Sequence, residues 1–137
     1  MTVSKLDTSK ADFDGWATVA GVKCSDGRTI GHDAFSQNDG AIVPLVWQHG
    51  HGEVTNVLGH AMLENRGNGV YAYGFFNGSQ QAEHARELIE HGDINAMSIF
   101  ANQLRQKGSI VEHGNIVEVS LVLRGANPGA TIENVSV

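Results

Sequence analysis

The stretch ENRGNGVYAYGFF, residues 64–76, joins a turn to a strand. The segment ENRGNG is rich in Asn and Gly, which suit a tight turn between two strands. The following side chains alternate between two faces, with Tyr71, Tyr73 and Phe75 on one and Val70, Ala72, Gly74 and Phe76 on the other. Together with the apolar segment VTNVLGHAML (54–63) before the turn, this pattern predicts a β-hairpin.

The rest of the chain repeats this alternation of short apolar segments and turn signals. The 137 residues include 17 Gly and only 2 Pro, with 41% hydrophobic and 18% charged residues, which is typical of one soluble globular domain. We therefore predict a mostly β domain over residues 13–137, preceded by a flexible segment at 1–12. The expected architecture is a barrel-like sheet flanked by one or two helices.

Further elements are placed by local signals. Strands are expected at 13–22, 41–48, 94–106 and 108–123, and a short helical turn within 32–40. The segment SQQAEHARELIEHG predicts a helix that begins after Ser79 as N-cap and ends at Gly92.

Composition excludes several classes of function. The net charge is −6 and Lys and Arg do not cluster, which argues against nucleic-acid binding. No apolar run approaches the length of a membrane span, and the N-terminus lacks a signal-peptide pattern. We expect a protein that stays in the cytosol where it is made. The single Cys24 lies in a polar turn, so we expect neither a disulfide nor a reactive thiol there.

One hydroxyl interrupts the apolar run AMSIFA, residues 96–101. Ser98 is either a structural hydroxyl or a nucleophile, and a nucleophile requires a base elsewhere in the chain. The loop VWQHGHGE (46–53) offers His49 as that base, because Gly50 and Gly52 let the backbone bring it close to a partner. The same loop also allows a zinc site made of His49, His51 and His60 with Glu53.

The last long strand carries a carboxylate on a strand of apolar residues. Period-two alternation places Val117, Val119, Leu121 and Leu123 on one face and Ile116, Glu118, Ser120 and Val122 on the other. Glu118 needs a partner there, which is either Arg105 or Arg124 in a salt bridge or an imidazole that it orients. Ser120 on the same face is a rival nucleophile or a simple strand hydroxyl.

Three segments together resemble the prohead proteases of tailed phages, which are similar in fold to herpesvirus assembly proteases. They are VPLVWQHG (43–50), HGDINAMSIFANQL (91–104) and IVEVSLVLRGANPGA (116–130), and the resemblance covers residues 15–132. It implies Ser98 as nucleophile, His49 as general base and Glu118 as the third member. The related viral enzymes use a histidine there, which keeps His113 and His60 as substitutes.

The chain departs from the family's Gly-x-Ser-x-Gly pattern at Ala96 and Phe100. We therefore look for oxyanion donors at Arg124 and Gly125, just after the last strand.

The resemblance also implies a function. It predicts a serine endopeptidase of phage head maturation that cuts the scaffold, the scaffolding segment of the major capsid protein, and itself. This would take place inside the procapsid in the host cytoplasm, by a homodimer without a cofactor. Two alternatives remain open: a catalytically silent capsid- or scaffold-binding module of the same fold, and a zinc hydrolase using His49, His51 and His60.

Overall fold

The structure, a computed structural model, describes residues 6–50 and 52–136. Within these residues lie one α-helix, three 3-10 helices and eight strands. The strands are β1 (Phe13–Val19), β2 (Thr29–Ile30), β3 (Ile42–Trp47), β4 (Val57–Asn65), β5 (Gly69–Phe76), β6 (Ala96–Lys107), β7 (Ile110–Val122) and β8 (Ile132–Val135). The helices are α1 (Gln80–His91), η1 (Thr8–Lys10), η2 (Ser36–Asn38) and η3 (Val54–Asn56).

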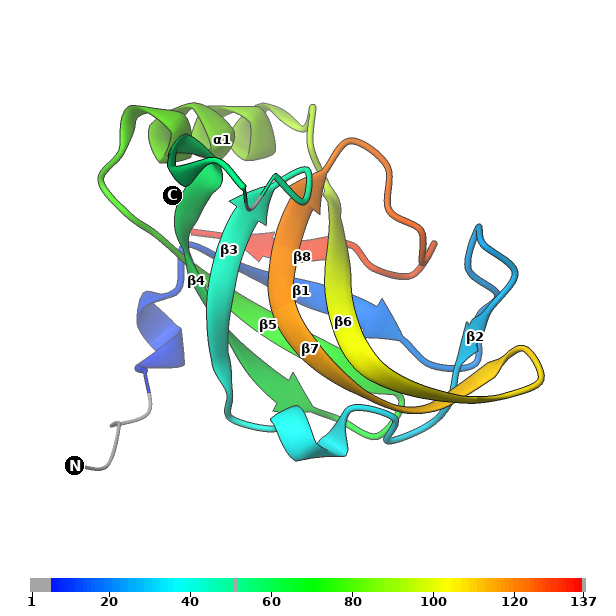
Figure 1. Cartoon of the computed structure of the whole chain (residues 1–137). Helices are drawn as coiled ribbons and strands as arrows, with labels where there is room; N and C mark the ends of the chain where they lie inside the picture. Colours follow the sequence, from blue (N-terminus) through cyan, green and yellow to red (C-terminus); the bar gives the residue numbers. More distant parts are fainter. Residues whose placement is uncertain (1–5, 51, 137) are drawn as a thin grey trace.

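All eight strands belong to one curled sheet. The hydrogen-bonded order is β2-β7-β3-β4-β5-β1-β8, and β6 pairs with β7. In Figure 1 strands β3, β7 and β6 run side by side in front, and β5, β1 and β8 cross behind them. The two edges meet where Ala96 bridges Thr131 and the Met97 N–H donates to the Ala130 carbonyl at 3.0 Å. The predicted mostly β, barrel-like fold is confirmed.

The hairpin predicted from residues 54–76 is β4 and β5. Their register runs from Asn65 opposite Val70 to Gly59 opposite Phe76. Gly74 leaves room for the ring of Phe13 on β1, because a Cβ at this position would lie 2.2 Å from that ring. The glycine inside this strand thus makes room for an aromatic side chain of the strand paired with it.

Strand β3 is a central strand in spite of its proline. Pro44 lies opposite His60 of β4, while the parallel pairing with β7 begins one residue later, at Leu45. The missing N–H of Pro44 is therefore placed just before the ladder with β7 starts. The C-terminal ends of β3 and β7 lie at the same end of the barrel, where β6 begins.

The predicted alternation of the last strand is wrong in its first half. Glu118 pairs with Phe100, but the next pair is Ile116 with Ala101, so Val117 is an extra residue in a bulge. The bulge places Ile116 in the same core as Val119 and Leu121. Leu123 lies beyond the end of β7 and is exposed.

Helix α1 covers one end of the barrel, as Figure 1 shows, and it has the predicted caps. The Ser79 hydroxyl accepts the Ala82 N–H at 3.1 Å, and Gly92 ends the helix with φ of 88°. Ala82, Ala85 and Ile89 are buried beneath it. No helix within 6–50 and 52–136 is long and apolar enough to cross a membrane.

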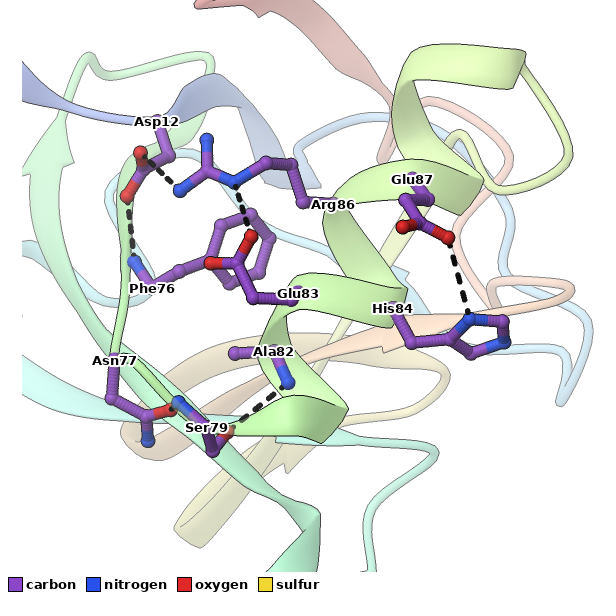
Figure 2. A network of polar contacts seen from close by, with 9 residues as sticks. All are labelled: Asp12, Phe76, Asn77, Ser79, Ala82, Glu83, His84, Arg86 and Glu87. Atoms are coloured by element: carbon purple, nitrogen blue, oxygen red, sulfur yellow. Dashed lines mark hydrogen bonds and ion pairs between the residues drawn. The ribbon is translucent and has the colours of Figure 1, made fainter.

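Asp12 ties the helix to the sheet (Figure 2). Its Oδ1 accepts a hydrogen bond from Arg86 of α1 at 2.8 Å, and its Oδ2 accepts one from the Phe76 N–H at 2.7 Å. The Arg86 guanidinium also lies 5.1 Å from the centroid of the Phe76 ring. The segment expected to be loose, 1–12, is described from Leu6 and contains the turn η1 before this anchor.

Candidate active site

His49 lies directly after β3, in a backbone conformation that residues with a Cβ seldom adopt. Gln48 and His49 have φ of 51° and 58°, in the left-handed region. Hydrogen bonds to the end of β7 hold this turn. Gln48 N–H donates to the Leu121 carbonyl at 2.9 Å, and the Leu123 N–H donates to Gln48 Oε1 at 2.9 Å. The imidazole is thereby turned toward β6 and β7 instead of following the strand.

Ser98 faces this imidazole from β6. Strand pairing places Ser98 opposite Ser120 of β7, two residues from Glu118. The Ser98 Oγ lies 3.0 Å from His49 Nε2, which is hydrogen-bond distance between a hydroxyl and an imidazole. The hydroxyl in the run AMSIFA is therefore in contact with the histidine of the Gly-rich loop.

Glu118 contacts the other nitrogen of the same ring. Its Oε1 lies 2.6 Å from His49 Nδ1, and the residue is 3% exposed. Because a carboxylate only accepts hydrogen bonds, Nδ1 carries the hydrogen and Nε2 is left to accept the proton of Ser98. Glu118, His49 and Ser98 thus form a hydrogen-bonded series of carboxylate, imidazole and hydroxyl, the arrangement by which serine hydrolases activate a hydroxyl.

Ser120 is fully buried beside these three residues. Its hydroxyl donates to Glu118 Oε1 at 3.0 Å and accepts the backbone N–H of His49 at 3.0 Å. Both hydrogen bonds thus go to residues of the series formed by Glu118, His49 and Ser98. The sequence alone predicted Ser120 as a strand hydroxyl or a rival nucleophile, and not as a partner of these residues. The available signal was its place two residues after Glu118, on the same strand face.

A hollow of about 410 Å³ opens in front of the series. Ser98 and His49 line it together with both residues predicted as oxyanion donors, Arg124 and Gly125. Gly125 packs against β6, since a Cβ there would lie 2.8 Å from the Met97 carbonyl oxygen. Only glycine allows this loop to come so close to the strand that carries Ser98.

A second hollow of about 250 Å³ adjoins the first at Ser98 and Ala126. Its lining is mostly apolar, with Phe35, Leu104 and Val111 among the side chains. Cys24 lies in this wall, and burial raises the pKa of its thiol, so the prediction that it is not a reactive nucleophile fits the structure.

The other residues singled out in the sequence lie elsewhere. His113 pairs with Arg105 in the distal part of the β6–β7 hairpin, and the exposed His60 stacks on Phe75 with 5.4 Å between ring centroids. Among the described side chains, no group of three His, Cys, Asp or Glu gathers as metal ligands. His51, which the zinc alternative needs, lies outside the described residues.

Comparison with solved structures supports the fold assignment. A similar structure is the KSHV protease, crystallised in complex with a hexapeptide phosphonate inhibitor, with a TM-score of 0.63 and 14% sequence identity. The match covers 87% of this chain and 62% of that chain. No curated protein matches the sequence.

Fold and site together define a herpesvirus-protease-like barrel that carries a serine-hydrolase arrangement of side chains. The whole chain, residues 1–137, matches the family described as caudovirus prohead serine protease. The chain belongs to this family, and the resemblance seen in the three segments is confirmed.

Proposed function

We propose that the protein is a serine endopeptidase whose nucleophile is Ser98, with His49 as general base and Glu118 as the residue that orients the base. The single observation that carries this proposal is the series of contacts from Glu118 Oε1 through both ring nitrogens of His49 to Ser98 Oγ, at 2.6 and 3.0 Å. His113 and His60 are set aside as third members, because Glu118 already contacts the Nδ1 atom that a third member would hold.

The chemistry follows from this series. His49 Nε2 takes the proton of Ser98 as the Oγ attacks a peptide carbonyl carbon, and the imidazolium then gives the proton to the leaving amine. Water attacks the resulting acyl-enzyme by the same route, which frees Ser98 and releases the acid.

Negative charge on the carbonyl oxygen would develop in the hollow in front of Ser98. We assign its stabilisation to the Gly125 N–H and the Arg124 guanidinium, because both residues line that hollow. The support is the close packing of Gly125 on Met97, the residue before Ser98.

Family membership supports the substrates and the place of action. We propose that the protein cuts the scaffold, the scaffolding segment of the major capsid protein, and itself, inside the procapsid in the host cytoplasm. We further propose a homodimer that needs no cofactor. A protease made together with its substrates must stay inactive until assembly, and dimerisation that orders the Arg124 loop would supply such control.

Co-expression with the cognate major capsid protein tests the function. Wild type and Ser98→Ala are compared by mass spectrometry of the capsid protein, with Ser120→Ala alongside. Defined fragments with wild type that disappear in Ser98→Ala support the protease and locate the cut. Intact capsid protein bound equally by wild type and Ser98→Ala would instead indicate the silent binding module.

A further inference from the structure

Ser120 is a polar residue at a fully buried position of the sheet. It is 0% exposed, and it lies between Ser98 of β6 and Val46 of β3 in the middle of three paired strands. A buried hydroxyl must be hydrogen-bonded, and an apolar residue of similar size would fill this position without that demand. Both partners of the Ser120 hydroxyl belong to the proposed catalytic series.

The first partner is the backbone of the base. The His49 N–H donates to Ser120 Oγ at 3.0 Å. Two successive residues with left-handed φ, Gln48 and His49, are disfavoured unless surrounding contacts hold them. The bonds of Gln48 to Leu121 and Leu123 hold the first of these residues, and the bond to Ser120 holds the second.

The second partner is the carboxylate. The Ser120 hydroxyl donates to Glu118 Oε1 at 3.0 Å, and the same oxygen accepts the Nδ1–H of His49 at 2.6 Å. His49 is therefore attached to this strand face through both its backbone N–H and its ring Nδ1. Ser120 Oγ and Glu118 Oε1 complete a closed ring of three hydrogen bonds, which fixes the imidazole toward Ser98.

We propose that Ser120 is a positioning residue. It fixes the backbone of His49 and the carboxylate of Glu118 relative to each other, so that His49 Nε2 points toward Ser98. This inference rests on the proposed function, because it requires Ser98 and His49 to act together. Ser120 itself lacks access to substrate, so its effect on the reaction is transmitted through the other two residues.

A fluorophosphonate reagent tests the role without knowledge of the natural substrate. In this reaction Ser98 Oγ bonds to phosphorus, fluoride leaves, and His49 takes the hydroxyl proton. We would compare wild type, Ser120→Ala and Ser120→Thr. Ser79→Ala serves as the matched control, since it also removes one hydrogen-bonded hydroxyl but at the cap of α1. The maximal rate constant and the half-saturating reagent concentration are measured separately.

A positioning role predicts that Ser120→Ala lowers the maximal rate constant about 10- to 100-fold. The half-saturating concentration should change little, Ser79→Ala should match wild type, and Ser120→Thr should recover part of the rate because it keeps a hydroxyl. The NMR resonance of the His49 Nδ1 proton, which lies far downfield in a short bond to a carboxylate, should move or broaden in Ser120→Ala alone. That resonance reports the same geometry if Ser120→Thr does not fold.

Other outcomes separate the two hypotheses. Equal rate constants and an unchanged Nδ1 resonance in Ser120→Ala, with Ser98 still labelled, would overturn the positioning role and leave the protease intact. Labelling that persists in Ser98→Ala but stops in Ser120→Ala would make Ser120 the nucleophile and overturn both. The reaction is run at a protein concentration at which the wild type is dimeric, and a dimeric wild-type protein that does not react at all would contradict the proposed function itself.

Discussion

Replacing Glu118 by Gln removes a charge from the proposed catalytic series while keeping its shape. Glu118 Oε1 can be replaced by an amide oxygen that still accepts from His49 Nδ1 and from Ser120, so the fold should persist. What is lost is the negative charge beside the imidazolium that forms when Ser98 gives up its proton. The change therefore separates electrostatic stabilisation from packing.

The size of the effect follows from the exposure of the pair. The His49 side chain is 37% exposed while that of Glu118 is 4% exposed, an environment between water and the protein interior. Two unit charges about 4 Å apart in such a setting attract by about 4 kcal/mol, which corresponds to about 10³-fold in rate. An amide that turned its NH₂ group toward Nδ1 would also impose the wrong tautomer, and losses near 10⁴-fold are then expected.

The assay is the maximal rate of phosphonylation of Ser98, followed by intact mass, with thermal unfolding measured alongside. His113→Ala and His60→Ala are the matched controls, because they remove the two alternative third members. We expect a loss of about 10³- to 10⁴-fold in Glu118→Gln and wild-type rates in both histidine variants. A folded Glu118→Gln protein that reacts at the wild-type rate, or an equal loss of rate in either histidine variant, would exclude Glu118 as the residue that orients His49.

Three further predictions concern the loop, the helix and an outer face of the sheet. Gly125→Ala places a Cβ 2.8 Å from the Met97 carbonyl oxygen and should lower the phosphonylation rate about 10²-fold. The control Gly78→Ala, with no heavy atom within 4 Å of its Cβ, should react at the wild-type rate. Equal rates in both variants would show that the Gly125 loop is not part of the site. Asp12→Ala breaks two hydrogen bonds, to Arg86 and to a backbone N–H. It should lower the free energy of unfolding by about 2 kcal/mol in urea titration without changing the phosphonylation rate. An unchanged urea midpoint would show that the contact between helix and sheet at Asp12 is dispensable. Burial and a hydrogen bond to Asp14 raise the pKa of Tyr71 from 10.0 to about 12. Between these two pH values the unfolded chain loses the Tyr71 proton while the folded chain keeps it. The free energy of unfolding therefore falls by about 1.4 kcal/mol for each pH unit of increase because of Tyr71. Tyr71→Phe should remove that part of the decline, and identical slopes in both proteins would contradict the burial argument.

Local patterns predicted the elements that depend on local contacts. The hairpin β4–β5 and the helix after Ser79 follow from turn chemistry, alternation and caps, all of which involve residues close in sequence. The bulge at Val117 could not be predicted, because it depends on the pairing of β7 with β6 and leaves no mark on the apolar pattern. The short strands β2 and β8 were missed for the same reason, since each is defined mainly by its neighbour.

The candidate site divides in a similar way. The residue types marked His49, Ser98 and Glu118 as candidates, since an isolated carboxylate and an isolated hydroxyl on apolar strands need partners, and the resemblance to the prohead proteases implied their roles. The contacts between them depend on the left-handed backbone conformation at Gln48 and His49, and no residue type in the loop predicts that conformation. The dual hydrogen bond of Ser120 likewise required the register between β3, β6 and β7.

The most direct test of Ser98 as the nucleophile is to identify the residue that reacts with a fluorophosphonate. Trypsin cleavage after Lys and Arg places Ser98 in the peptide 87–105 and Ser120 in the peptide 108–124, so one peptide map distinguishes them. We expect the phosphonyl group on Ser98 alone and a loss of labelling in His49→Ala. An adduct on the peptide that contains Ser120, or labelling that persists in Ser98→Ala, would contradict this assignment of the nucleophile.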